Sequence, residues 1–204
     1  MNDAGFAQFA KQASKHGYNT YRFDFSGRGR SQGNYEQTTI TKLAEDLKTI
    51  FAYVQTRQAV DTARIGVWAQ SLGTIVTLVS KIAAKNYVFT GTVIEVEETL
   101  SNLFTQLDKE HTSKRTKSSG EAITIGAPFW NDCRNLNTKE LLATTIPTLL
   151  IHGENDKLVS VDNAKRAHKK LPNSTLEIVP ELTHAVQPRK RIHDRILAYF
   201  EKNL

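Results

Sequence analysis

Apolar positions along the chain follow two alternating spacings. Short apolar or alternating runs, which are typical of β-strands, occupy 18–25, 65–69, 87–96, 146–151 and 174–179. Between them, apolar residues recur every three or four positions, which predicts amphipathic helices over 5–16, 39–56, 72–85, 161–170 and 188–202. Strands that alternate with helices favour the α/β class with a doubly wound, mostly parallel sheet. No internal repeat or linker divides the sequence, so we expect a single α/β domain over 1–204.

One segment departs from this alternation. Residues 97–142 begin with an amphipathic stretch, continue as a charged run rich in Ser and Thr, and end in a short strand over 122–126 followed by mixed helix and turn. In an α/β domain, an insertion of this kind lies over one end of the sheet. We therefore expect a small lid-like insertion over about 97–142.

The junction between the strand over 65–69 and the next helix carries the first candidate chemistry. It reads Ala69-Gln70-Ser71-Leu72-Gly73, a Gly-x-Ser-x-Gly pattern with alanine in the first place. This pattern marks the nucleophile elbow, a sharp strand-to-helix turn that exposes a serine hydroxyl at the end of a sheet. Small residues are expected around the serine because neighbouring backbone approaches closely. The N–H groups that begin the helix point toward the reacting centre. A plain turn serine is the alternative to a nucleophile.

Two other strand exits carry an acid and a histidine. Asp156 follows the strand over 146–151, and His184 follows the strand over 174–179. Functional groups gather at the carboxyl ends of parallel strands, and the chain order serine, acid, histidine is that of the α/β-hydrolase triad. In such a triad the imidazole takes the serine proton, while the carboxylate fixes the imidazole and stabilises its charged form. Ser71, Asp156 and His184 are therefore the candidate nucleophile, orienting acid and base.

Other acids and histidines remain as alternatives. Asp24 also follows a predicted strand and is the strongest competing acid, although shaping its glycine-rich loop is the favoured role. Glu154 and Asp162 lie close to Asp156 in the sequence. His152 ends its strand, where a structural histidine is expected. The remaining histidines are expected to be non-catalytic: His16 at a helix C-terminus, His111 in the charged insertion, and His168 and His193 on basic helical faces.

Composition narrows the classes of partner and compartment. The 204 residues are 39% hydrophobic and carry a net charge of +6, but the basic residues are scattered except over 109–117 and 188–195. Neither run has interleaved aromatic residues, so a solvated face is favoured over a nucleic-acid site. Cys133 is the single cysteine, which fits a reducing compartment. With no stretch long and apolar enough for a membrane span and no leader after Met1, we expect a cytoplasmic protein with no membrane partner.

Four blocks of sequence carry a more specific pattern. They are YRFDFSGRGRS (21–31), AQSLG (69–73), IPTLLIHGENDKLV (146–159) and ELTH (181–184). Together they resemble the α/β-hydrolase superfamily, and within it the small serine esterases of the feruloyl-esterase and serine-aminopeptidase-like group. Serine at the elbow, with no aspartate there, argues against the haloalkane dehalogenase and epoxide hydrolase branches.

The resemblance implies a function for the candidate residues. It implies carboxylic-ester hydrolysis through an acyl-enzyme on Ser71, with His184 as general base and then acid, and with Asp156 orienting it. The N–H of Leu72 would be an oxyanion-hole donor. The implied partner is a small-molecule ester substrate, and no metal or organic cofactor is implied, because the sequence has neither a His-Glu-x-x-His motif nor a cysteine pair.

The resemblance also implies a feature that this sequence lacks. Members of the superfamily carry about three strands before the first helix seen here, and the third ends in a His-Gly motif whose loop supplies a second oxyanion-hole N–H. This sequence begins at Met1 without that motif. We therefore expect an N-terminally incomplete hydrolase with a gap between the strands over 18–25 and 65–69. Unpaired backbone groups facing such a gap cost about 1–3 kcal/mol each if buried, and loss of one oxyanion donor lowers the rate about 10²–10³-fold.

Two kinds of rival function stay open. An amide- or peptide-cleaving serine hydrolase and an acyltransferase use the same triad, and the sequence does not separate them from an esterase. A non-catalytic binding or interaction protein could retain a degenerate or truncated hydrolase scaffold, because fold alone does not imply function.

Overall fold

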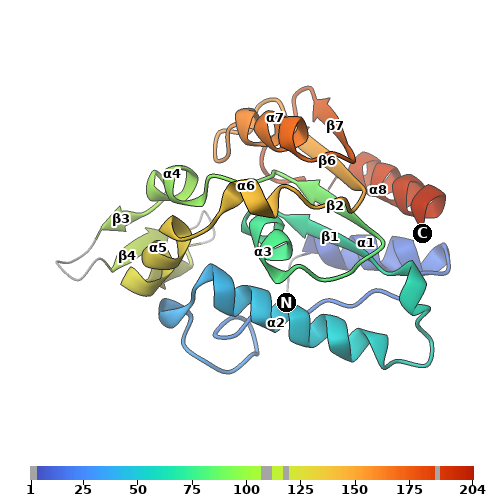
Figure 1. The fold of residues 1–204 in the computed structure, drawn as a ribbon, viewed down its shortest axis with the longest axis horizontal. Helices are drawn as coiled ribbons and strands as arrows, with labels where there is room; N and C mark the ends of the chain where they lie inside the picture. Colours follow the sequence, from blue (N-terminus) through green and yellow to red (C-terminus); the bar gives the residue numbers. More distant parts are fainter. Residues whose placement is uncertain (1–3, 107–111, 117–119, 187–188) are drawn as a thin grey trace.

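A parallel four-stranded sheet forms the centre of the molecule (Figure 1). The computed structural model describes residues 4–106, 112–116, 120–186 and 189–204. The strands run in the order β1 (Gly66–Gln70), β2 (Asn86–Thr90), β6 (Thr148–Gly153) and β7 (Ser174–Val179), and every neighbouring pair is parallel. The predicted doubly wound, mostly parallel α/β sheet is confirmed.

Eight α-helices and two short 3₁₀ turns surround the strands in the described part of the chain. The helices are α1 (Ala4–Lys15), α2 (Ile40–Gln55), α3 (Leu72–Ser80), α4 (Val96–Ser101), α5 (Ala127–Arg134), α6 (Thr138–Leu141), α7 (Val161–Lys170) and α8 (Lys190–Asn203), and the turns are Tyr35–Gln37 and Thr62–Arg64. The five helices predicted from periodicity are all present, although α3 is five residues shorter than its predicted span because Lys81 adopts a left-handed conformation that ends it.

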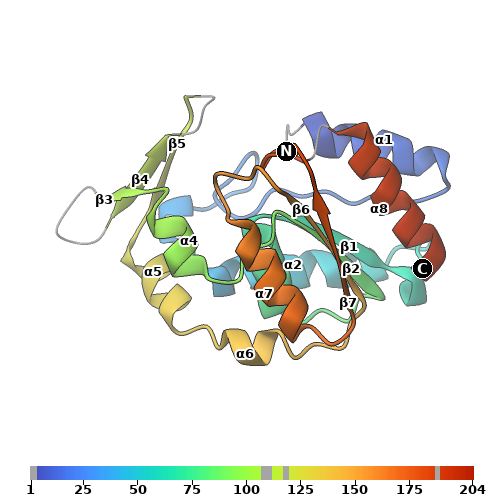
Figure 2. The same ribbon diagram turned by 90° about the horizontal axis from the view of Figure 1, so that it is seen from above.

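The two faces of the sheet bury separate cores because consecutive side chains of a strand point to opposite sides. On one face, Tyr87, Phe89 and Leu150 pack with the apolar stripe of α2 and with α3. On the other face, Val88, Leu149 and Ile151 pack with α1 and α8. Figure 2 shows α1 and α8 side by side on that face. Because both faces of β2 and β6 are buried, the side chains in the middle of each strand are apolar, and the two strands appear as continuous apolar runs in the sequence.

The prediction of a strand over 18–25 is wrong. These residues are extended but belong to no sheet, and among the described residues no strand pairs with the outer edge of β1. A cavity of about 830 Å³ lies between this extended segment and β1. Residues 18–23 and 25 line one side of it, and residues 64–71 line the other. Period-two alternation marks extended backbone, but a strand also needs a neighbour to bond. Among the described residues β1 thus has an unpaired edge, as predicted, but no second strand borders the gap, because 18–25 forms none.

Strand β2 is also shorter than its predicted span of 87–96. It ends at Thr90 because Gly91 takes a positive φ of 56°, which turns the chain away from the sheet. The next residues lead into α4, so Val96 begins a helix instead of ending a strand.

The segment over 97–142 lies at the left in Figures 1 and 2 as far as α5, whereas its α6 lies nearer the centre. Leu100, Phe129 and Leu142 of this segment belong to the same core as the main sheet. The segment contains an antiparallel sheet of β3 (Thr105–Gln106), β4 (Ser113–Thr116) and β5 (Ala122–Ile125), followed by α5 and α6. The indole N–H of Trp130 on α5 donates to the Ser113 hydroxyl at 3.1 Å, which ties the sheet to the helix. The predicted strand over 122–126 is confirmed, while parts of the predicted charged run lie outside the described residues.

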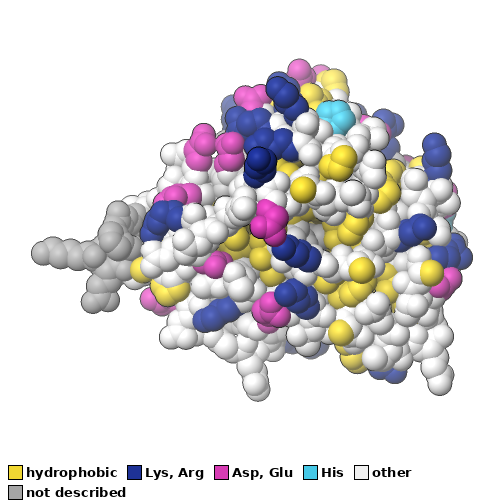
Figure 3. All heavy atoms as spheres, in the orientation of Figure 1, with side chains coloured by type: hydrophobic (Ala, Val, Ile, Leu, Met, Phe, Trp, Pro, Cys, Tyr) yellow, Lys and Arg dark blue, Asp and Glu magenta, His cyan; other side chains and the backbone are white. Residues whose placement is uncertain are grey.

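Charged side chains of both signs lie on the face of the molecule that Figure 3 shows. On the face that Figure 3 shows, Lys and Arg side chains lie interspersed with Asp and Glu. This face therefore offers no single basic patch of the kind that binds nucleic acid. None of the helices in the described part of the chain is long and apolar enough to cross a membrane.

Candidate active site

Ser71 occupies a strained turn between β1 and α3. Its φ of 53° and ψ of −126° lie in a region that non-glycine residues rarely adopt. The backbone holds this conformation from both sides: the Ser71 N–H donates to the Thr90 carbonyl at 2.9 Å, and the Thr74 hydroxyl lies 2.7 Å from the Ser71 carbonyl. A strained serine between a parallel strand and a helix is the geometry of a nucleophile elbow.

The elbow is less crowded at Gly73 than the sequence suggests. A methyl group added there would meet Ala69 Cβ at 3.7 Å, which is an ordinary contact. We expected the small residues on either side of Ser71 to be required because neighbouring backbone approaches closely. This expectation is wrong at Gly73, where α3 has room for an alanine side chain.

Asp156 follows β6 and is held by donors on both carboxylate oxygens. Its Oδ1 accepts the N–H groups of Leu158 and Val159, each at 2.9 Å, and its Oδ2 lies 2.7 Å from His184 Nδ1. The side chain is fully buried. Burial alone would raise the pKa of Asp156, but the hydrogen bonds from the two neighbouring imidazoles and from the Val159 N–H outweigh it and hold the pKa well below its usual range. The carboxylate is therefore charged wherever the protein is folded near neutral pH.

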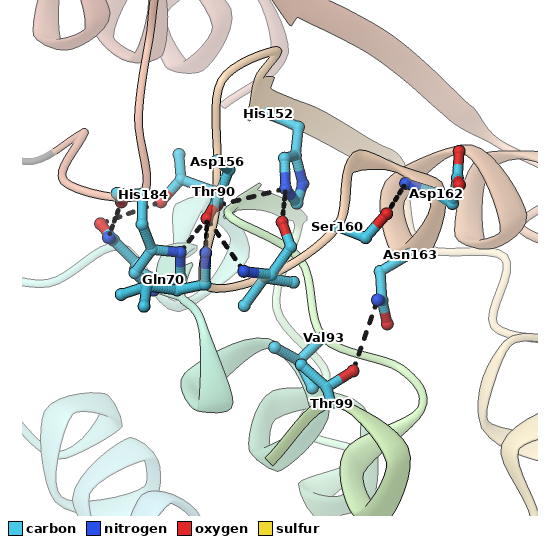
Figure 4. A network of polar contacts seen from close by, with 12 residues as sticks. Gln70, Thr90, Val93, Thr99, His152, Asp156, Ser160, Asp162, Asn163 and His184 are labelled. Atoms are coloured by element: carbon cyan, nitrogen blue, oxygen red, sulfur yellow. Dashed lines mark hydrogen bonds and ion pairs between the residues drawn. The ribbon is translucent and has the colours of Figure 1, made fainter. Parts of the chain in front are cut away.

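His184 lies in the loop after β7 and is placed through its backbone as well as its ring. Its carbonyl accepts a hydrogen bond from Gln70 Nε2 at 2.8 Å, which connects the histidine loop to the end of the elbow strand. Its ring packs over Gly91, where an added methyl would come within 3.1 Å of the imidazole. Because Asp156 accepts a hydrogen bond from the Nδ1–H of His184, the other ring nitrogen, Nε2, is left as the base. Figure 4 shows Asp156 between His184 and His152.

Ser71 and His184 line the same cavity, the one that runs along β1. Among the described residues, the His184 ring is bonded to Asp156 and makes no hydrogen bond to the Ser71 hydroxyl. The serine–histidine contact is often long in enzymes without substrate. Leu72 is the first residue of α3, so its N–H has no partner within the helix. The structure therefore joins two of the three predicted side chains directly and brings the third to the same cavity.

A family model described as "Serine aminopeptidase, S33" matches residues 4–119, which is more than half of the chain. The chain belongs to this family of α/β hydrolases. The match includes the Ser71 elbow, while Asp156 and His184 lie beyond it.

Solved structures of α/β hydrolases share the fold of this S33-family chain. Est1E from Butyrivibrio proteoclasticus, whose structure holds ferulic acid, superposes with a TM-score of 0.83 at 16% identity, over 99% of this chain and 84% of that one. The esterase domain of a Rhodothermus marinus protein gives 0.74 at 17% identity, over 97% and 80%. A Paleococcus ferrophilus monoacylglycerol lipase gives 0.72 at 15% identity, over 99% and 90%. The α/β-hydrolase fold expected from the sequence is confirmed.

Two curated Escherichia coli proteins also match the S33-family chain. Each is named an uncharacterized 31.7 kDa protein in the traX-finO intergenic region and is 31% identical over 65 residues, which is 32% of this chain. The match spans 23% of the length of those relatives.

Of the competing acids of the S33-family chain, Asp24 and Asp162 have other partners. Asp24 Oδ2 accepts the Arg30 N–H at 3.2 Å and its carbonyl accepts the Ser31 hydroxyl, so it shapes its loop as expected. Asp162 pairs with Lys165 at the surface in the first turns of α7, and Glu154 is exposed. Asp156 is thus the acid that meets His184.

The other histidines divide into surface and buried groups. His16 lies 2.7 Å from Glu201 and is among the residues that line the cavity, whereas exposed His168 lies 2.9 Å from Ser174 and does not line it. The expectation that His193 is solvated is wrong: it is buried against Phe9 and Trp68. His111 lies outside the described residues.

Three residues of the site escaped the sequence analysis. Gln70, Gly91 and Thr74 hold the loops around Ser71 and His184, and of these Gln70 lies inside the recognised motif. Each has a partner in a distant segment, Val93 for Thr74 and His184 for Gln70 and Gly91, and no local spacing could reveal these contacts. Within the described residues, no cluster of three or more His, Cys, Asp or Glu side chains could hold a metal ion.

Proposed function

We propose that this chain is a serine hydrolase that cleaves carboxylic esters through an acyl-enzyme on Ser71. His184 is the general base and then the general acid, Asp156 orients it, and the N–H of Leu72 stabilises the oxyanion. The substrate is a small-molecule ester, and the reaction uses no cofactor.

The observation that carries this proposal is the 2.7 Å pair of Asp156 and His184 at the cavity onto which the strained Ser71 also opens. A buried carboxylate that remains charged stabilises the imidazolium that forms when the histidine takes a proton. A serine without such a neighbour is a poor nucleophile.

The proposed reaction has two halves with the same proton carrier. Ser71 Oγ attacks the ester carbonyl carbon while its proton passes to His184 Nε2, and the oxyanion receives the Leu72 N–H. Collapse breaks the bond to the alcohol, which leaves with the proton from His184. Water then attacks the acyl-enzyme, gives a proton to His184, and the acid departs as Ser71 Oγ takes that proton back.

Ester substrates are favoured by what the similar structures are called. They are an esterase domain, a monoacylglycerol lipase and a protein holding ferulic acid, and all share this fold. The alternative is supported by the family description, which names an aminopeptidase. Comparing an ester with an amide of the same acyl group separates the two, because the triad chemistry is shared and the leaving group differs.

The test of the triad is labelling of the purified chain with a fluorophosphonate probe. We expect labelling of the native sequence, none of Ser71→Ala, and normal labelling of Ser101→Ala, since Ser101 is exposed on α4. Circular dichroism and thermal unfolding verify that each variant is folded. A folded native chain that does not label would refute the proposal and favour a binding protein on a hydrolase scaffold.

A further inference from the structure

His152 is a buried histidine that the proposed reaction does not use. It lies on β6, opposite Ile178 of β7 in the parallel register, and its side chain is fully buried. Its Nε2 lies 3.0 Å from the Val159 carbonyl oxygen and 3.3 Å from Asp156 Oδ2 (Figure 4). The expectation of a structural histidine accounts for its burial but not for its contact with the triad carboxylate.

The partners of Nε2 fix where the ring carries its proton. A carbonyl oxygen accepts hydrogen bonds and cannot donate them, so the short contact to Val159 requires a proton on Nε2. The same ring nitrogen lies 3.3 Å from Asp156 Oδ2. The other ring nitrogen, Nδ1, is buried and has no hydrogen-bond partner among the described residues, which fits a bare lone pair and would leave an N–H there unsatisfied.

The Asp156 carboxylate needs a contact from outside its own loop, because its two backbone donors belong to that loop and move with it. Leu158 and Val159, which bond Oδ1, belong to the same short loop as Asp156. His152 instead belongs to the sheet, bonded through β6 to β2 and β7. Its N–H therefore connects both the carboxylate and the far end of the loop to a rigid strand.

We propose that His152 is a positioning residue, which holds Asp156 in the orientation that meets His184 by sharing its Nε2–H between Asp156 Oδ2 and the Val159 carbonyl. This inference rests on the proposed function for its catalytic consequence. The sequence signal is the spacing of four between His152 and Asp156 across the exit of a buried strand.

Steady-state kinetics of ester hydrolysis separate positioning from mere packing. His152→Leu removes the donor but keeps an apolar side chain, and His152→Gln keeps an N–H donor near the place of Nε2. We expect His152→Leu to lower kcat about 10–100-fold, as a misplacement of about 1 Å does, with KM within about twofold because the substrate does not touch His152. His152→Gln should recover most of the loss, and His168→Leu, a change at an exposed histidine, should match the native chain.

Two kinetic outcomes would overturn the inference. One is a folded His152→Leu with native kcat. The other is a His152→Gln variant as slow as His152→Leu at equal thermal stability, because the donor would then be irrelevant. If His152→Leu does not fold, His152→Asn replaces it, since the shorter amide does not reach Asp156.

A spectroscopic measurement tests the same contact without turnover. The Nδ1–H proton of His184, bonded to Asp156 at 2.7 Å, gives its own proton NMR resonance. Loss of a competing donor on Oδ2 should shift this resonance in His152→Leu and leave it in place in His168→Leu. An unchanged resonance refutes the role of His152 even where the chain is inactive, whereas an inactive native chain with a shifted resonance refutes only the proposed function.

Discussion

Gly153 offers a direct test of how the histidine loop is placed. It ends β6, and the loop that carries His184 crosses directly over it. A methyl group at this position would lie 2.2 Å from the Leu182 carbonyl oxygen, 2.6 Å from the Leu182 carbonyl carbon and 2.9 Å from the Thr183 carbonyl oxygen. All three atoms belong to the backbone, so no side-chain rotation can relieve the contact.

The size of the effect of Gly153→Ala follows from these distances. A contact of 2.2 Å must open to at least 3.0 Å, a displacement of 0.8 Å two residues before His184. A misplacement of about 1 Å costs about 10²-fold in rate. The shift also strains the bond from the Asn155 N–H to the Leu182 carbonyl, and such overpacking costs about 1–3 kcal/mol of unfolding free energy.

The assay combines the rate of fluorophosphonate labelling with thermal unfolding. For a chain of this size we expect Gly153→Ala to lower Tm by about 2–12 °C and to label about 10²-fold more slowly. Gly73→Ala is the matched control, because its methyl has room and alanine favours α3 by up to about 1 kcal/mol. If Gly153→Ala labels and unfolds like the native chain, the close crossing of the His184 loop over β6 is refuted.

Three further predictions concern single side chains. Thr74→Val leaves the Val93 N–H, which the Thr74 hydroxyl accepts at 3.0 Å, without a partner and should lower the unfolding free energy by about 1–3 kcal/mol in denaturant titration. Because the pKa of Asp156 is lowered in the folded state, its contribution to stability is complete above about pH 5 and is lost as pH falls further; Asp156→Asn should flatten that part of a Tm–pH curve. Burial, with help from nearby Asp132, raises the pKa of Cys133 to about 12, so its thiol should react with a disulfide reagent at pH 8 only after denaturation.

Local patterns predicted those features that depend on neighbours in the sequence. The apolar stripe of α2 follows from the spacing of its residues alone, and the structure adds a cap at Thr39, whose side chain accepts the Lys42 N–H. The prediction of a strand over 18–25 failed because a strand requires a hydrogen-bonding partner elsewhere in the chain. The prediction that His193 is solvated failed because its helical face carries basic residues, whereas Phe9 of α1 and Trp68 cover the imidazole.

The candidate site shows the same division. Ser71, Asp156 and His184 could be predicted because each follows a strand, and parallel strands end at one edge. The bond from Gln70 to the His184 carbonyl joins residues 114 positions apart, and no spacing encodes it. The room beside Gly73 likewise depends on how α3 leaves β1, which the sequence motif does not specify.

The open edge of β1 has a consequence for heat inactivation. Among the described residues, β1 is bonded on one side by β2, whereas β2 and β6 are each bonded on both sides. An edge strand opens locally at a lower free energy than the strands inside a sheet. Ser71 stands at the end of that strand, so amide hydrogen exchange should be faster in β1 than in β2, and on heating the serine should lose its reactivity several degrees before the sheet itself melts.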